Sequence, residues 1–244
     1  IWNYFYKGNK PWKQGPYKDG VKDGKWITWY ENGKKLQEGN FLGGHETGRW
    51  QSWYQNGQLK DDGFFKKERP DSLGRIRKSE TDSLWKGWFA SGKTNYEGSY
   101  VLGKKHGKWT FWFDKNGKIR ETGNYWYGLK TGYWVTYHEG GINIDSEGKY
   151  NKSGKQTGTW KYYYDSGGPM TVQKYKEGKL TGKSTSWHTN GKIKSVASYK
   201  LMKQKRIGGR EPVYNSAPHG TWIFYDLKGV ETGRIVYKNG KKIS

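Results

Sequence analysis

The stretch GKWTFWFDKNGKIRETGNY at residues 107–125 decides the fold, because its pattern recurs along the chain. A Gly is followed two residues later by a Trp, then by a second aromatic, an Asn-Gly turn and a short run that ends in Tyr or Phe. A fixed period of about 24 residues is typical of repeat arrays, whose units bury their apolar faces against their neighbours. One catalytic domain around a single core is therefore not expected. The copies start near residues 24, 48, 83, 107, 132, 158, 182 and 220.

Each copy is predicted to be a β-hairpin. Its first half, such as GKWITWYENGK (24–34), is aromatic and β-branched and reaches an Asn-Gly pair, which favours a two-residue type I′ turn. Its second half alternates with period two and has a small residue two positions before the closing aromatic, as in Gly98 before Tyr100. Such a residue weakens a strand unless a bulky neighbour lies over it. We expect the Trp of the adjacent strand to cover it.

The two aromatics of the first strand predict the character of its two faces. Trp26 and Trp29 are three residues apart and so point to opposite sides. One face should be well buried, and the other half covered by aromatics and lysine stems. The sequence thus predicts an all-β protein, an elongated array of about eight β-hairpin repeats that forms a twisted antiparallel ribbon or solenoid-like sheet. We expect residues 1–244 to form a single repeat domain.

The runs at 107–125 and at 220–242 (GTWIFYDLKGVETGRIVYKNGKK) resemble the MORN-repeat variant found in many bacterial proteins, among them YwqK-type antitoxins. The resemblance covers roughly residues 15–243. It implies a ribbon of hairpins used for protein contacts, membrane-lipid contact or dimerisation. It also implies that the chain is not an enzyme, because that family has no shared catalytic residue.

The chain is strongly basic, with 45 Lys and Arg against 22 Asp and Glu and a formal net charge of +23. A field of this size favours acidic partners: an acidic protein surface, an anionic lipid or a nucleic acid. Solubility alone is the competing interpretation, and lysines at turns and edges also discourage edge-to-edge pairing. Charge therefore favours a class of partner without identifying it.

Two basic insertions, near 65–82 and 200–218, interrupt the regular spacing. Both follow a closing aromatic, so they should emerge from the same edge, roughly 50 Å apart in a straight array of strands about 4.8 Å wide. Tolerated surface loops are the simpler interpretation. The second aromatics are the other candidates for a binding surface, on the less buried face. The predicted partner-binding residues are Lys66, Lys67, Arg69, Arg75, Arg77, Lys203, Lys205, Arg206, Trp29, Trp53, Trp88, Trp112 and Trp187.

Sequence signals for catalysis, metals and cofactors are missing. The five His are isolated, and no paired His, Cys or EF-hand spacing occurs, so neither a metal site nor a cofactor is expected. The chain has no Cys, which fits a reduced cytosol and equally a bacterial envelope protein. No apolar run is long enough to span a bilayer. Tyr6 and Tyr17 resemble closing aromatics, and a chain that starts inside a repeat without Met suggests a processed N-terminus, so a signal peptide or lipid anchor is possible before residue 1.

These observations predict a non-enzymatic scaffold that mediates protein–protein interaction, as a subunit of a bacterial cell-envelope complex in the periplasm or at the outer membrane. One alternative is an antitoxin-like or immunity-like protein that binds a toxin, for which a cytoplasmic location fits. Another is a binder of polyanions, either nucleic acid or anionic lipid. A polyanion binder should lose affinity steeply with salt, because its affinity rests on released counterions.

Overall fold

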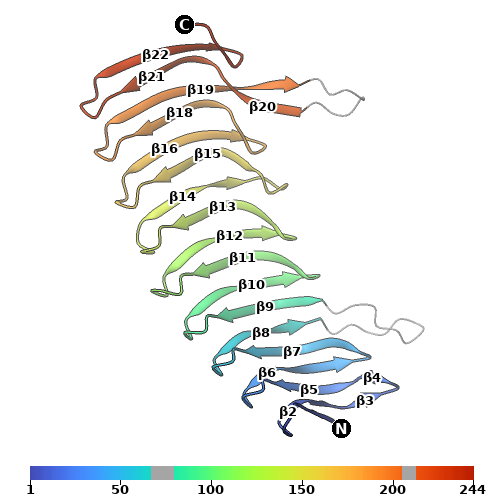
Figure 1. Ribbon diagram of the computed structural model, residues 1–244. Helices are drawn as coiled ribbons and strands as arrows, with labels where there is room; N and C mark the ends of the chain where they lie inside the picture. The colour runs from blue at the N-terminus through green and yellow to red at the C-terminus, as the bar shows by residue number, and fades with distance from the viewer. Residues whose placement is uncertain (67–79, 205–212) are drawn as a thin grey trace. The chain divides into compact units, whose positions relative to one another are not determined.

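The computed structural model describes residues 1–66, 80–204 and 213–244, and these ranges contain strands, turns and connections but no helix (Figure 1). Contacts divide the chain into two units, Ile1–Ile119 with Tyr125–Gly128 and Arg120–Asn124 with Leu129–Ser244. Within each unit the strands pair antiparallel, one hairpin after another in chain order. The predicted all-β array of hairpin repeats is confirmed.

The first unit contains β1 (Trp2–Phe5), β2 (Pro11–Gly15), β3 (Tyr17–Lys18), β4 (Val21–Lys22), β5 (Gly24–Trp29), β6 (Lys35–Leu42), β7 (His45–Trp53), β8 (Leu59–Phe65), β9 (Thr81–Trp88), β10 (Thr94–Val101) and β11 (Lys104–Trp112). The second contains β13 (Leu129–Tyr137), β14 (Ile144–Tyr150), β15 (Gln156–Tyr163), β16 (Pro169–Lys176), β17 (Lys179–Leu180), β18 (Gly182–Trp187), β19 (Ile193–Gln204), β20 (Val213–Pro218), β21 (Gly220–Tyr225), β22 (Glu231–Lys238) and β23 (Lys241–Lys242). Strand β12 (Ile119–Trp126) contributes residues to both units.

A further copy precedes those counted from the sequence. Strands β1 and β2 form a hairpin in which Trp2 lies opposite Gly15, as Trp26 lies opposite Gly39 in the next copy. Tyr17 is its closing aromatic, as expected. Tyr6 is not a closing aromatic. It is the residue after the second aromatic of this copy, and its hydroxyl donates to the Trp29 carbonyl at 2.9 Å.

The core of each unit is a row of aromatic rings on one face of the hairpins, here called the spine. It alternates between the first Trp of a copy and a closing aromatic, in edge-to-face contacts that suit the quadrupoles of the rings. Trp109 and Trp134 are only 1% and 2% exposed. The first unit contains the series Trp26, Phe41, Trp50, Phe65 and Trp85, with neighbouring centroids 5.2 to 6.3 Å apart. The second contains Trp134, Tyr150, Trp160 and Tyr175, 5.0 to 6.5 Å apart.

Six of the first Trp residues lie against a Gly of the preceding copy. A Cβ built on Gly39 would lie 2.2 Å from the ring of Trp50, so only Gly fits there. The indole Nε1 of Trp50 donates to the Asn40 carbonyl at 3.1 Å, which fixes the ring over the Gly. The expectation that the Trp of an adjacent strand covers the small residue is confirmed. The same contact joins Gly15, Gly63, Gly98, Gly123 and Gly148 to Trp26, Trp85, Trp109, Trp134 and Trp160.

One junction between two copies departs from this rule on both sides. Ser184 takes the place of the first Trp and is buried. The register of β16 on β18 sets Val172 opposite Thr185, which brings Gln173 beside Ser184. Gln173 stands where the preceding copies have Gly. A small residue therefore accompanies each following first Trp: Gly in six junctions and Ala197 before Trp222.

The hairpin turns differ from the predicted type I′ geometry. Type I′ needs positive φ at both central residues, but Gly33 has φ +83° while Asn32 is not in the positive region. The Gly33 N–H donates to the Tyr30 carbonyl, and the Tyr30 N–H to the Lys34 carbonyl, which closes a three-residue loop with a bulged Gly. The Asn is used for its side chain: Oδ1 of Asn32 accepts from the Lys34 N–H, and Nδ2 donates to the Gln55 carbonyl in the next turn.

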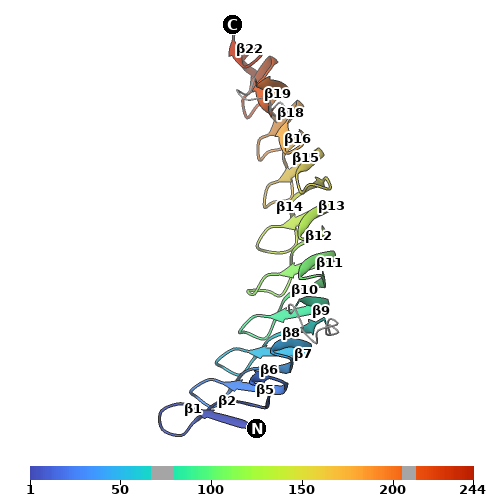
Figure 2. The same ribbon diagram turned by 90° about the vertical axis from the view of Figure 1, so that its right-hand side faces the viewer.

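The type I′ geometry occurs instead at the connectors between copies, which Figure 2 turns toward the viewer. Both residues of Leu102-Gly103 and of Glu177-Gly178 have positive φ. The two insertions occupy this same connector position within their units. The first lies between β8 and β9, and the second lies between the regular part of β19 and β21 and includes β20, which pairs with the end of β19. Turns within copies and connectors between copies therefore lie at opposite ends of the strands.

Candidate interaction surface

The second aromatics lie on the face opposite to the spine, here called the outer face. Trp53 and Trp88 are partly exposed, and lysines lie over their rings, with Lys35 Nζ 5.3 Å and Lys86 Nζ 5.9 Å from the ring centres. These distances are within the range of cation–π contacts, so lysines cover part of these exposed rings. The expected division into a buried face and a half-covered face is confirmed. Partly exposed in the same way are Trp29, Trp112 and Trp187.

Ion pairs cover the outer face of the first unit. Its centre is a row of residues that lie directly opposite one another on successive strands, here called the central row: Ile27, Glu38, Gln51, Asp62, Lys86, Glu97 and Thr110. Arg49 donates twice to Asp62, at 2.9 and 2.6 Å, and Lys86 lies 3.2 Å from Glu97. Exposed pairs like these contribute little stability. Their effect is to neutralise this part of the face.

A shallow pocket of about 390 Å³ opens on the same face beside Trp88. Phe64 and Leu84 are 45% and 52% exposed at its rim. Large apolar side chains left in water next to a half-buried Trp are characteristic of contact surfaces. The remaining lining residues are Arg49, Asp62 and Lys86.

In the second unit, the carboxylate of Glu147 on β14 is the centre of a hydrogen-bonded cluster on the outer face. Glu147 accepts from the hydroxyls of Tyr133 and Tyr163 and lies 3.4 Å from Lys161. Burial alone would raise the pKa of Glu147, but these three partners together lower it below its ordinary value. Burial and the hydrogen bond to Glu147 in turn raise the pKa of Tyr163 to about 12. The cluster is therefore built around an ionised Glu147.

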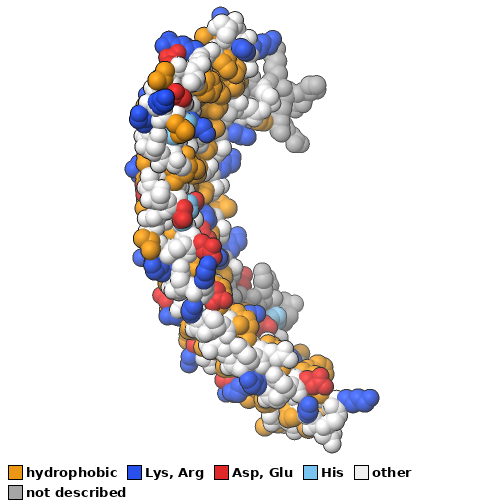
Figure 3. Space-filling view, turned by 60° about the vertical axis from the view of Figure 1, so that its left-hand side comes forward, with side chains coloured by type: hydrophobic (Ala, Val, Ile, Leu, Met, Phe, Trp, Pro, Cys, Tyr) orange, Lys and Arg blue, Asp and Glu red, His pale blue; other side chains and the backbone are white. Residues whose placement is uncertain are grey.

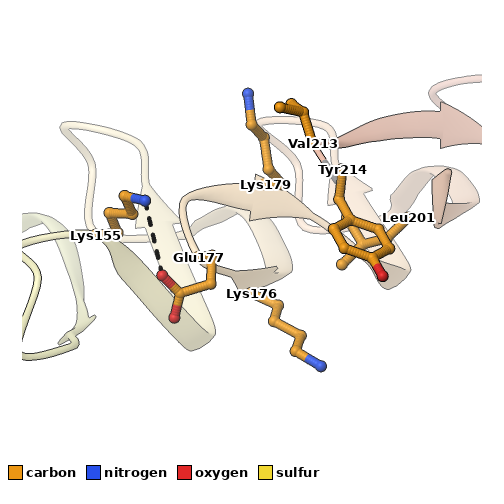
Figure 4. A pocket seen from close by; sticks show the side chains of 7 residues that line it. All are labelled: Lys155, Lys176, Glu177, Lys179, Leu201, Val213 and Tyr214. Atoms are coloured by element: carbon orange, nitrogen blue, oxygen red, sulfur yellow. Dashed lines mark ion pairs between the residues drawn. The ribbon is translucent and has the colours of Figure 1, made fainter. Parts of the chain in front are cut away.

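A second pocket, of about 650 Å³, lies in the second unit where β19 and β20 extend beyond the regular hairpin (Figure 4). Lys155 and Glu177 form an ion pair at 3.8 Å on one side of it. Tyr214 and Leu201 come from the extended strands on the other side, and Tyr214 lies opposite the predicted site residue Lys203. Lys176 and Lys179 point in opposite directions in this view, so the pocket does not gather its cations around one point.

The predicted basic residues are only partly within the described ranges. Lys66 and Lys203 lie at the bases of the two insertions, where the Lys66 N–H donates to the Glu80 carbonyl and Lys203 is exposed. Their role in binding stays a prediction. Lys67, Arg69, Arg75, Arg77, Lys205 and Arg206 lie outside the described residues.

Two series of side-chain hydrogen bonds join neighbouring copies, and neither was predicted from the sequence. The residue after the second aromatic donates to the backbone of the next copy: the Tyr54 hydroxyl to the Trp88 carbonyl at 3.0 Å, and the Tyr164 hydroxyl to that of Trp187 at 2.7 Å. The lysine after the turn Gly does the same, as Lys93 Nζ does to the Asp114 carbonyl at 2.9 Å. These lysines are structural, and their recurrence next to the turn Gly was the available signal. Figure 3 shows the basic side chains spread along the turn edge rather than gathered in one place.

Other kinds of site have no support in the part of the chain that the structure describes. No group of three or more His, Asp or Glu is placed to hold a metal ion there. The same residues include no helix long and apolar enough to cross a membrane.

Comparison with known families agrees with the repeat geometry. The model of the MORN repeat variant matches residues 22–42, 46–67, 105–127, 156–177 and 180–201. Each match corresponds to one hairpin and its flanking turn, so these repeats belong to that family. MORN repeats are a non-catalytic repeat type, common in scaffold proteins that mediate interactions. No curated protein matches the chain.

Proposed function

We propose that this chain of MORN-variant repeats is a non-enzymatic scaffold that holds a protein partner on its outer face. The observation that carries the proposal is the row of half-exposed second aromatics, which recurs from copy to copy on the face that the spine does not use. Folding explains six of the first Trp residues through their contacts with Gly. It does not require a second large aromatic on the other face, where a smaller β-branched residue would serve.

The exposed rim at Phe64 and Leu84 supports a protein as the occupant. These side chains and Trp88 offer an apolar centre, and Arg49 with Asp62 offers a hydrogen-bonding border. Protein interfaces commonly combine an aromatic anchor with a polar rim of this kind. A nucleic acid would instead favour a continuous groove of unpaired cations, whereas Arg49 and Lys86 at this pocket are each paired with a carboxylate.

We place this scaffold in a bacterial cell-envelope complex. A chain without Cys is compatible with the oxidising periplasm. Fractionation of native cells, with detection of the chain in envelope or cytosolic fractions, tests this location. Recovery in the cytosol with a toxic partner would replace the envelope scaffold by the antitoxin-like alternative.

The partner itself is tested by photo-crosslinking in native cells. A benzophenone amino acid is placed at Phe64 or at Leu84, with Lys152 in an exposed turn as the control position. We expect one protein to crosslink at both outer-face positions and not at the control. Crosslinks of equal yield at all three positions, or none, would overturn the proposal.

A further inference from the structure

The outer face changes character within the second unit. In the first unit the central row contains carboxylates on β6, β8 and β10, each paired with a cation. In the second unit the last carboxylate before the change is Glu147 on β14. The next strands, β15, β16, β18, β19 and β21, contain neither Asp nor Glu.

The central row becomes aliphatic over the same strands. Val172 lies opposite Thr185, Thr185 opposite Val196, and Val196 opposite Ile223. All four are partly exposed. Trp187, one of the second aromatics, is on this face two residues along the strand from Thr185. The row is bounded by the cations Lys161 and Arg234, each already paired with a Glu.

Unpaired lysines flank the aliphatic row. Strands β16, β18 and β19 each have a lysine two residues from their member of the row, and residues two apart on a strand share a face. These lysines are Lys174 beside Val172, Lys183 beside Thr185 and Lys194 beside Val196. All three are exposed, and none has a carboxylate within ion-pair distance among the residues described. The stem of Lys174 passes 3.6 Å from the Cβ position of Gly182, which brings it beside Lys183. Like charges that face one another without a counter-ion destabilise a sheet.

We propose that this aliphatic row with its lysines, which we call the basic row, binds an acidic segment of the protein partner. The inference rests on the proposed function and names the chemistry of the contact. Carboxylates of the segment pair with Lys174, Lys183 and Lys194, and its apolar side chains cover Val172, Val196 and Ile223. The two features together favour a protein segment over a nucleic acid, because a polyanion needs the cations but gains little from an aliphatic stripe.

The test measures binding to the full chain by fluorescence anisotropy. The probe is a labelled peptide of alternating Glu and Leu, about 10 residues long, which at about 3.3 Å per residue crosses the strands of the basic row. The variant changes Lys174, Lys183 and Lys194 to Gln. The control variant changes Lys18, Lys152 and Lys238 to Gln. These lysines lie in turns or at strand ends, and their substitution removes the same amount of charge. We expect a loss of about tenfold or more in the first variant and little change in the control.

Three results would overturn the inference: equal affinity of the two variants, no binding of the peptide by the parent chain, or a stronger effect on oligothymidylate than on the peptide. The melting temperature of the first variant shows that it is folded, and we expect it to equal or exceed that of the parent, since repulsion has been removed. If crosslinking at Phe64 and Leu84 succeeds while this test fails, the scaffold proposal stands and only the acidic chemistry of its partner is wrong.

Discussion

Gly98 lies so close to Trp109 that a Cβ on Gly98 would be 2.2 Å from the indole ring. We expect Gly98→Ala to destabilise the first unit by about 3 kcal/mol, because neither the strand nor the buried ring can move without disturbing its neighbours. Urea unfolding followed by Trp fluorescence measures the change. Gly233→Ala is the matched control, since nothing lies within 4 Å of its Cβ position, and it should be neutral or slightly stabilising.

The opposite side of this contact gives a second prediction. Trp109→Ala should destabilise the protein by about 3 to 5 kcal/mol, the range of large aromatic truncations in a core. Trp109 is 1% exposed and its ring lies 5.0 Å from that of Tyr100. A melting temperature equal to that of the parent would show that the spine is not the core.

The junction of Gln173 with Ser184 permits a reciprocal test. Ser184→Trp alone should destabilise, because the new ring meets the side chain of Gln173. Gln173→Gly alone should also destabilise, because it exposes backbone and adds freedom to the unfolded chain. The double variant restores the Gly and Trp pair of the other copies, and we expect it to be more stable than the sum of the single changes by about 1 kcal/mol or more. Additive effects in a double-mutant cycle would contradict the pairing rule.

The tyrosine hydroxyls that donate to the next copy give a fourth prediction, in which two substitutions change stability in opposite directions. Tyr54→Phe removes the donor to the Trp88 carbonyl and should cost about 1 kcal/mol. Phe89, the corresponding residue of the next copy, has no hydroxyl, so Phe89→Tyr should add a donor and stabilise by up to about the same amount. Chemical denaturation of both variants checks the pair, and a loss in both would show that the position favours ring packing over hydrogen bonding.

The Glu147 cluster predicts how stability depends on pH. The folded state lowers the pKa of Glu147 below its ordinary value of 4.5, so its contribution is present above that pH and is lost as the pH falls through the folded pKa. At high pH, the raised pKa of Tyr163, about 12, means that stability falls as the pH rises from 10 toward that value. Unfolding titrations should show the acid-side loss in the parent chain and a smaller one in Glu147→Gln. An unchanged acid limb in the variant would exclude Glu147 as its source.

Much of the fold follows from the sequence because one period repeats the same contacts. The first Trp, the small residue and the closing aromatic recur at fixed positions, and these positions alone identify the spine and the Gly contact. The predicted turn type was wrong because Asn-Gly was interpreted through backbone φ alone, whereas Asn32 is used for its amide. Tyr6 was misassigned because its hydrogen bond reaches the next copy, over 23 residues.

The candidate surface was only partly predictable. The second aromatics were expected on the less buried face, and Trp53 and Trp88 are there. The loss of carboxylates after Glu147 can be seen at one repeat position, three residues before the closing aromatic. Earlier copies have Glu38, Asp62 and Glu97 at this position, and later copies have Val172 and Val196. It acquires meaning only once strand register shows that these residues are neighbours across the sheet.

The contact between Gly and Trp also bears on how such a chain grows. An ordinary copy offers a recess at its end and a ring at its beginning, so a duplicated period fits between any two ordinary copies without further change. The junction of Gln173 with Ser184 fits neither kind of neighbour. Copies on either side of it can be gained, lost or exchanged in evolution, but the two that meet there must be inherited together.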